Sequence, residues 1–475
     1  MSFLDLVYSF FIENRLFFGV ILGIVVLLFC ILRLKIHAFI ALLIGSIVAG
    51  LVAGLNAIEI MDTVRSGMAN TLGFVATVVG LGAMFGAILE HSGGAKAIAN
   101  FMVRKFGLKR SPLAMVISGF LIAIPVFFDV AFIILVPMIY ALQRKTKKSL
   151  LLYAIPLLAG LAITHAFIPP TPGPIAVAEI IGAELGWVIL IGFLVGIPTA
   201  LVSGLVFGKY ISKKIHVNAP VETQTMEEDN LPNISITLWI IATPIVLILL
   251  NTVLSSGLLE NAYIHSEKKL ALLFNSILHF INSNEIGMLV ALIGHPFAAL
   301  IIANILAWYF FGIRRGFSKE QLFKITGKSL EPAGTIILLT GAGGVFKQVL
   351  TDTGAGTLLA TSLSDAGFPI IVFAFISAAI VRIIQGSSTV AMITAAGLVA
   401  PLLVGVELKS ANLACLVIAI ASGASIFSHV NDSGFWLVGQ YLGITEKQTF
   451  RSWTLMTTIL AFTGFLTVLL LNAIV

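Results

Sequence analysis

The residues best suited to chemistry in this sequence are polar and ionisable side chains that interrupt long apolar stretches. A charge at membrane depth costs at least about 2.5 kcal/mol, so such residues are candidates for function by default. Asp129 follows the turn-like sequence IPVFF, where its carboxylate is suited to carry a proton or to orient a substrate. A carboxylate that only holds the turn, neutralised by helix amides, is the structural alternative.

Later in the chain, a second polar cluster forms a turn-like counterpart to the one before Asp129. It consists of Gln385, Ser387, Ser388 and Thr389. Hydroxyl groups and the amides of a helix N-terminus can hold an anionic carboxylate, although helix capping by serine and threonine explains the same residues. Arg382 lies one turn earlier. Its guanidinium group suits the binding of a substrate carboxylate, and snorkelling or pairing with a structural acid is the alternative.

Two further segments are too polar or too rich in proline to remain helical. The sequence HAFIPPTPGP, from His165, holds four prolines in ten residues, and proline breaks a helix interior. The sequence SHVNDSG, from Ser428, is polar almost throughout. Unwound backbone at membrane depth is tolerated where it lines a cavity. We therefore predict that the substrate site formed by the residues above also includes His165, Thr171, Asn431 and Ser433.

Proton coupling requires a group that is charged when exposed on one side and neutral when carried across. Desolvation favours the neutral form of a carboxylate, and an approaching cation favours its charged form. We predict Asp432 as the first candidate and Asp129 as the second. His429 is the runner-up, because a histidine can do the same from the opposite direction. A structural Asp432 that caps the following half-helix is the alternative.

The composition places these residues in a membrane. Of the 475 residues, 59% are hydrophobic and 11% are charged, whereas soluble proteins carry roughly 25% charged residues. The first run of about 20 apolar residues follows acidic residues and lacks a cleavage site, so we expect a retained helix. Cys30 and Cys415 lie in separate apolar runs and suggest neither a disulfide nor a metal site. We predict no cofactor and no metal, and the net charge of +6 requires no nucleic acid.

The sequence also repeats itself. HAFIALLIGSIVAG, from His37, returns as HPFAALIIANILAW, from His295, with seven identities in fourteen positions. The segments that end at His165 and His429, AGLAITH and GASIFSH, are related in the same way. Two repeats in a chain this apolar are typical of a secondary transporter, in which the substrate binds between the repeats near the bilayer midplane.

The apolar runs predict an all-α membrane protein with five crossings in each repeat. The expected crossings are 17–32, 38–55, 72–89, about 150–185 and 188–207 in the first repeat, and 236–254, 286–311, 334–350, about 413–442 and 453–473 in the second. Between the third and fourth crossings of each repeat, about 30 apolar residues with a turn at their centre predict a re-entrant hairpin. The first hairpin is 112–142 and the second is 369–404. The repeats are then 1–215 and 235–475, joined by a cytoplasmic linker, 216–234.

The distribution of lysine and arginine predicts the orientation. In this topology 21 of the 28 lie on one face and five on the other, which makes the first face cytoplasmic. Because five is odd, the second repeat is inverted relative to the first and both termini are periplasmic. The first hairpin then opens to the cytoplasm and the second to the outside. The acidic stretch 221–230 lies in the linker.

Six stretches of the chain carry a resemblance to a known family. They are GLGAMFGAILEHSGGA (80–95), IPVFFDVAFIILVPMIYAL (124–142), HAFIPPTPGPIA (165–176), EPAGTIILLTGAGGVFKQVL (331–350), GSSTVAM (386–392) and ASGASIFSHVNDSGFWLV (421–438). Together they resemble the gluconate permease (GntP-type) family of bacterial proton symporters, within the ion-transporter superfamily. The resemblance implies uptake of gluconate, glycerate, fructuronate or a related hydroxy-acid anion, with D-serine carried by one branch. It also implies an inner-membrane location, proton coupling and an elevator-like motion, and homodimers are common among relatives.

Several alternatives remain open at this point. Thr171 stands where many gluconate carriers have a histidine, so a smaller acid such as glycerate fits equally well. A sodium-coupled carboxylate transporter is the first rival, because hydroxyls and unwound carbonyls can also hold Na⁺. A D-serine/proton symporter is the second. A channel requires a continuous polar pore, and an enzyme requires a nucleophile and base or a metal-ligand cluster. The sequence has no HExxH motif and no cluster of cysteine and histidine, so we predict that the protein is not an enzyme.

Overall fold

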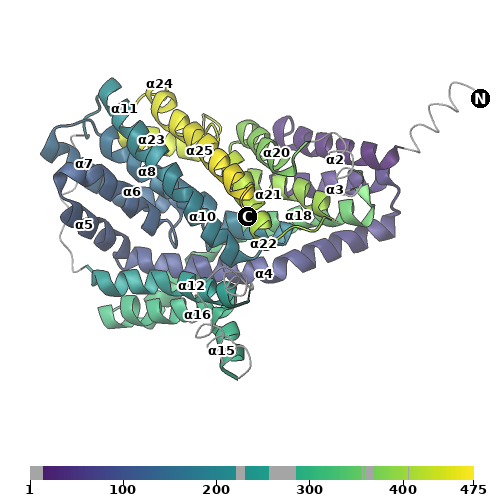
Figure 1. Cartoon of the computed structure of the whole chain (residues 1–475), viewed down its shortest axis with the longest axis horizontal. Helices are drawn as coiled ribbons and strands as arrows, with labels where there is room; N and C mark the ends of the chain where they lie inside the picture. Colours follow the sequence, from purple (N-terminus) through teal and green to yellow (C-terminus); the bar gives the residue numbers. More distant parts are fainter. Residues whose placement is uncertain (1–13, 221–230, 256–284, 356–357, 359–367, 405) are drawn as a thin grey trace, which may run out of the picture.

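The computed structural model describes residues 14–220, 231–255, 285–355, 358, 368–404 and 406–475. Within these ranges every regular element is helical and no strand occurs (Figure 1). The main helices of the first half are α2 (Arg15–Leu32), α3 (Ala38–Ala53), α4 (Ala57–His91), α5 (Gly94–Phe106), α6 (Ser111–Ile122), α7 (Phe128–Thr146), α8 (Leu151–Phe167), α9 (Pro172–Ile181), α10 (Leu185–Thr199) and α11 (Phe207–Lys214). The acidic stretch 221–230 of the expected linker lies outside the described residues.

The second half has a similar order of elements. Its helices are α12 (Ile234–Ser255), α15 (Glu285–Gly294), α16 (Pro296–Ala307), α17 (Lys319–Lys328), α18 (Leu330–Asp352), α20 (Ile370–Gln385), α21 (Ser388–Val399), α22 (Ser410–Gly423), α23 (Ser433–Leu442), α24 (Glu446–Thr449) and α25 (Leu455–Asn472). In both halves a long helical segment is followed by a helix pair, a broken helix and a last long helical segment. This shared order supports the interpretation as two repeats.

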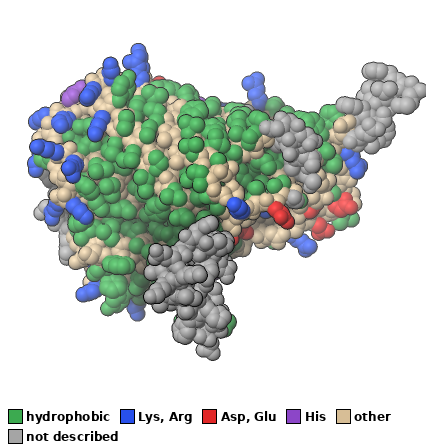
Figure 2. All heavy atoms as spheres, in the orientation of Figure 1, with side chains coloured by type: hydrophobic (Ala, Val, Ile, Leu, Met, Phe, Trp, Pro, Cys, Tyr) green, Lys and Arg blue, Asp and Glu red, His purple; other side chains and the backbone are tan. Residues whose placement is uncertain are grey.

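The helices identify a multi-pass membrane protein. Seven helical segments in the described ranges are long and apolar enough to cross a membrane. They are Ala57–His91, Leu151–Ile181, Leu185–Lys214, Ile234–Leu254, Pro296–Arg315, Lys319–Asp352 and Glu446–Asn472. The other three expected crossings correspond to shorter apolar helices, α2, α3 and α22. Hydrophobic side chains cover the broad face of the molecule, and Lys and Arg side chains gather at the end that carries α5 and α11 (Figure 2).

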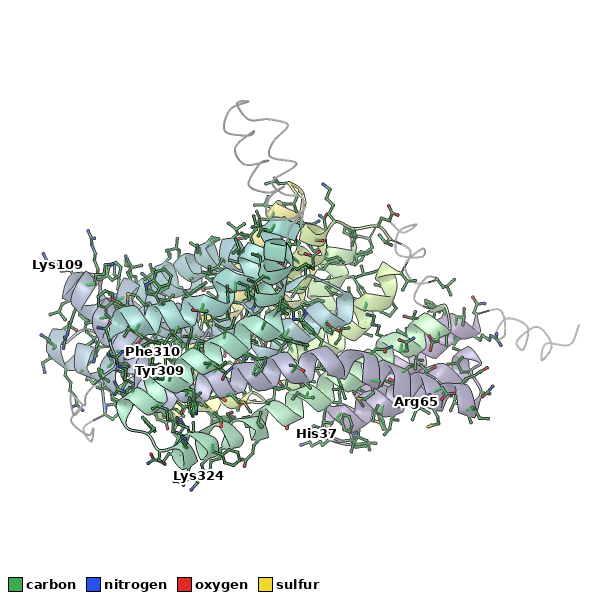
Figure 3. All side chains as sticks on the ribbon, turned by 90° about the horizontal axis from the view of Figure 1, so that it is seen from below. His37, Arg65, Lys109, Tyr309, Phe310 and Lys324 are labelled. Carbon is green, nitrogen blue, oxygen red and sulfur yellow. The ribbon has the colours of Figure 1, made fainter. Side chains whose placement is uncertain are left out.

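Several expected crossings differ in their bounds from the helices that contain them. Helix α4 begins at Ala57 and not near residue 72, because Asn56 and Glu59 form a capping box in which each side chain accepts a hydrogen bond from the other's backbone amide, at 3.0 and 2.8 Å. Such caps start a helix upstream of its apolar part, and α4 runs along much of the molecule (Figure 1, Figure 3). The expected crossing 334–350 also lies within a longer helix, α18, which begins at Leu330 and follows α17.

The expected single crossing 286–311 is wrong, because two helices occupy it. His295 ends α15 and caps α16, and its Nδ1 accepts a hydrogen bond from the amide of Phe297 at 3.3 Å. Pro296 is the first residue of α16. Proline favours this position and cannot continue a preceding helix. The apolar run concealed the break, because hydropathy does not report backbone conformation.

Each segment predicted as a hairpin contains two helices joined by a short turn, α6 with α7 and α20 with α21. Both predicted breaks are also present. Residues 168–171 separate α8 from α9, and residues 424–432 separate α22 from α23. The two halves meet where the long helices α4 and α18 pack together. A Cβ atom added to Gly344 would lie 2.0 Å from Thr71 Oγ1, and small residues of this kind allow close helix packing in membranes.

Candidate functional site

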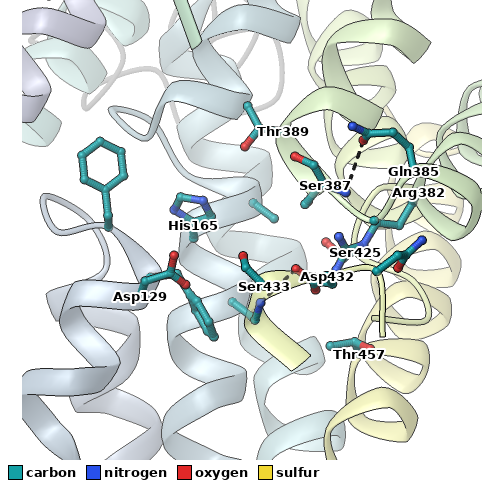
Figure 4. A pocket seen from close by; sticks show the side chains of 18 of the residues that line it. Asp129, His165, Arg382, Gln385, Ser387, Thr389, Ser425, Asp432, Ser433 and Thr457 are labelled. Carbon is teal, nitrogen blue, oxygen red and sulfur yellow. Dashed lines mark hydrogen bonds and ion pairs between the residues drawn. The ribbon is translucent and has the colours of Figure 1, made fainter. Parts of the chain in front are cut away.

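A cavity of about 640 Å³ lies where the helix turns and the helix breaks converge (Figure 4). It is bounded by the start of α7, the end of α8, the turn between α20 and α21, and the start of α23. Ten of the twelve residues predicted from the sequence line it: Asp129, His165, Arg382, Gln385, Ser387, Ser388, Thr389, Asn431, Asp432 and Ser433. Residues up to 304 positions apart in the chain, Asp129 and Ser433, therefore face one space.

An ion pair between Arg382 and Asp432 lies at one side of the cavity. The Arg382 Nη2 atom is 2.5 Å from Asp432 Oδ2, and the two side chains are 5% and 14% exposed. The Asp432 carboxylate also accepts hydrogen bonds from the Ser428 hydroxyl and from the Gly434 amide, the latter at 3.0 Å. Trp453 Nε1 in turn donates to Ser428 Oγ at 2.6 Å. Asp432 is thus the cap of α23 and the partner of a buried arginine.

The Arg382 guanidinium group has donors that this pair does not use. Its Nε and Nη1 atoms are buried and have no hydrogen-bond partner among the described residues. A buried donor without a partner costs about 1–3 kcal/mol, and a guanidinium presents five N–H donors that fit a carboxylate well. These donors therefore favour an anionic or polar ligand in the cavity that Arg382 lines.

The Asp129 carboxylate has a different environment. It lies in the first turn of α7 and is exposed in the cavity. In the described part of the chain no hydrogen bond or ion pair reaches it. His165, in the last turn of α8, also lines the cavity, and its Nδ1 atom is buried without a partner in the described structure. Asp129 and His165 are therefore ionisable groups of the cavity for which the described part of the chain supplies no hydrogen bond or ion pair.

The turn between α20 and α21 presents a helix N-terminus to the cavity. Ser387 caps α21 by accepting a hydrogen bond from the Val390 amide at 3.4 Å. Ser388 and Thr389 follow in the first turn and line the cavity. Free N–H groups and the helix dipole make such an end suitable for an anion.

The same turn is held against the break that precedes α23. Gly386 has a φ of 91°, and a Cβ atom there would lie 2.3 Å from the carbonyl oxygen of Asn431. The Asn431 amide donates to the carbonyl oxygens of Ile383 and Ile384 at 3.0 and 3.1 Å. Asn431 therefore satisfies the C-terminal end of α20 while lining the cavity.

Two predicted residues lie outside the lining of this cavity. Thr171 is buried in the break after α8, where its hydroxyl donates to the Ile168 carbonyl at 2.5 Å. His429 is partly exposed, and its Nε2 lies 2.8 Å from the Ile383 carbonyl oxygen. Sequence position identified the break in both cases but could not give the direction of these side chains.

The sequence interpretation also missed residues that line the cavity. They include Phe127, Phe128, Ser425, Trp453 and Thr457. The last two lie in SWTLMTT, a polar patch at the start of the final apolar run. A search for polar residues within that run could have found them.

A polar cavity between helix turns inside a multi-pass helical protein is the arrangement of a membrane transporter. The family model described as "GntP family permease" matches residues 16–474. The chain therefore belongs to the GntP family of permeases, and permeases are transporters and not enzymes.

The similar proteins agree with this family. The low-affinity gluconate transporter of Escherichia coli (strain K12) is 39% identical over 444 residues, which cover 93% of this chain and 95% of that protein. The gluconate permease of Pseudomonas aeruginosa is 36% identical over 459 residues, 96% of each chain. The crystal structure of the Alcanivorax borkumensis YdaH transporter matches with a TM-score of 0.59 and 15% identity, over 88% of this chain and 89% of that chain. The last match shows a shared fold.

Proposed function

We propose that this protein imports a small hydroxy-carboxylate, gluconate in the first place, by proton symport. The names of the similar transporters support gluconate. The observation that carries the proposal is the pair of unsatisfied Arg382 donors beside the N-terminus of α21. Both features select a carboxylate over a neutral sugar, because each stabilises negative charge.

In this proposal different cavity residues bind different parts of the substrate. The carboxylate lies against Arg382 and the first-turn amides of Ser388 and Thr389. The hydroxyl-bearing carbons then extend toward Gln385 and Ser433, whose side chains can donate and accept hydrogen bonds. A cavity of about 640 Å³ is within the usual range for small-molecule sites.

We further propose that Asp129 is the proton-linked group, ahead of Asp432. Asp432 is held by Arg382, Ser428 and the Gly434 amide. Protonating it would leave Arg382 as a buried cation without its partner, which is costly. Asp129 lies in the same cavity without such a partner. The cavity holds one arginine and two carboxylates, Asp129 and Asp432, before the substrate adds a third carboxylate. A proton on Asp129 offsets this added negative charge.

We extend the proposal to the topology and motion of the whole protein. The repeats 1–215 and 235–475 are inverted, with hairpins over 112–142 and 369–404, and they move as an elevator-type transporter in the bacterial inner membrane. The concentration of Lys and Arg at one end of the molecule supports a cytoplasmic position for that end (Figure 2). Both termini are then periplasmic.

Gradient-driven uptake in proteoliposomes tests the proposal. Uptake of gluconate, glycerate, fructuronate and D-serine is compared under an imposed H⁺ gradient and an imposed Na⁺ gradient. We expect gluconate to accumulate with the H⁺ gradient and not with the Na⁺ gradient alone. Accumulation that follows Na⁺, or transport of D-serine without gluconate, contradicts the proposal.

A further inference from the structure

We propose that a second cavity is an anion-attracting vestibule, through which the carboxylate substrate enters and leaves the main site. This inference rests on the proposed function. The second cavity has a volume of about 630 Å³ and lies between the turn that joins α2 to α3, the start of α18, and the turn between α20 and α21. The sequence predicted no substrate contact in the turn between α2 and α3 or in α18.

The two cavities are continuous around the turn between α20 and α21. They share six lining residues: Pro332, Ile336, Gln385, Ser387, Thr389 and Asn431. A carboxylate that leaves the N-terminus of α21 on this side therefore passes directly into the second cavity. Shared walls of this kind distinguish a path from a separate pocket elsewhere on the molecule.

The charge of the second cavity differs from that of the first. Its ionisable lining residues are Lys35 and His37, and its lining contains no carboxylate. The main cavity, in contrast, has Asp129 and Asp432 opposite one arginine. A basic vestibule raises the local concentration of an anion at the boundary of the main site, since fields of one sign in a cleft attract the opposite charge.

The local structure keeps both basic side chains available. Lys35 has a φ of 53° in the turn, which the Ile36 amide closes by donating to the Cys30 carbonyl at 2.9 Å. The Lys35 side chain is exposed, and no ion pair reaches it in the described part of the chain. His37 caps α3 through its Nδ1, which accepts from the Phe39 amide at 3.3 Å. Its Nε2 remains for a ligand, and the residue lies near the middle of the long axis (Figure 3).

A charge on the path has a kinetic signature. It speeds both entry and exit, so its loss slows exchange while the equilibrium affinity of the main site changes little. We expect Lys35→Cys to lower kcat/KM for gluconate exchange about 10-fold, at the low end of the range for electrostatic steering. The Kd of gluconate, measured by calorimetry, is expected to change less than twofold.

Chemical modification of the cysteine introduced at position 35 separates the effect of its charge from the effect of side-chain shape. The variant is made with Cys30→Ala and Cys415→Ala and then treated with cationic, neutral or anionic methanethiosulfonates. The cationic reagent is expected to restore exchange, the neutral one to leave it low, and the anionic one to lower it further. Arg33→Cys is the matched control, because it lies in the same turn, is exposed, and does not line the cavity.

The outcomes distinguish this inference from the function on which it rests. If the three reagents give equal rates, or if Arg33→Cys behaves as Lys35→Cys does, the vestibule is overturned while gluconate transport stands. If the unaltered protein binds and exchanges no gluconate, the proposed substrate and the vestibule are both overturned.

Discussion

The two carboxylates of the main cavity come from different kinds of chain break and differ in their partners. Asp432, at the break before α23, has an arginine, a hydroxyl and a backbone amide. Asp129, at the turn before α7, faces the cavity with no such partner in the described structure. The comparison indicates that one carboxylate fixes a cation in place, whereas the other is available to change its charge.

The energetic difference between them is large. Removing one member of a buried ion pair costs about 3–5 kcal/mol, because the other charge is left uncompensated. A carboxylate that faces a cavity can be hydrated in either protonation state, so its change of charge disturbs the fold little. The predictions below test this division, beginning with the buried pair.

Arg382→Gln is expected to have the largest effect. It removes the proposed carboxylate ligand and leaves the partly buried Asp432 carboxylate without its cation. We expect gluconate binding to weaken by roughly 100-fold or more, measured by calorimetry, together with a lower Tm.

The double variant Arg382→Gln with Asp432→Asn is the control for stability. Removing both charges relieves the uncompensated carboxylate, so Tm should recover while binding stays weak. Recovery of binding in the double variant contradicts the assignment of Arg382 to the substrate carboxylate.

Gly386→Ala tests how the turn between α20 and α21 meets the break before α23. The positive φ alone costs a side chain about 1–2 kcal/mol, and the added Cβ lies 2.3 Å from the Asn431 carbonyl oxygen. We expect transport to fall at least 10-fold, with the Tm lowered by several degrees.

Gly354→Ala is its matched control. Gly354 also has a positive φ, 73°, but an added Cβ there meets nothing within 4 Å. Gly354→Ala is expected to show only the effect of backbone strain, with transport within twofold of that of the unaltered protein. Equal losses in the two variants contradict a specific contact between the turn and Asn431.

Ser388→Ala is expected to have the smallest effect. Ser388 lines the cavity in which we propose that the substrate binds. Loss of one hydroxyl hydrogen bond to the substrate costs about 0.5–1.5 kcal/mol, which corresponds to a rise in the gluconate Kd of roughly 2- to 10-fold. Ser377→Ala is the control, because that hydroxyl bonds to the Ala374 carbonyl within α20 and lies outside the cavity lining. An unchanged Kd for Ser388→Ala removes this residue from the site.

The sequence predicted the places where helices break better than the contacts made there. Proline at 169–174 and the polar run from Ser428 report local backbone conformation directly, so both breaks were found. The Arg382–Asp432 pair joins residues 50 positions apart, and their approach depends on how α20 packs beside α22. Thr171 and His429 were placed at the correct breaks but point outside the cavity lining, because rotation about a break is set by tertiary packing.

Accumulation of gluconate in proteoliposomes under an imposed proton gradient tests the central claim most directly. Asp129→Asn is compared with the parent protein for accumulation and for counterflow exchange, which needs no net proton movement. The account predicts that Asp129→Asn retains exchange and loses accumulation. If Asp129→Asn still concentrates gluconate when the gradient is applied, the proton-linked group lies elsewhere, and Asp432→Asn becomes the next variant to measure.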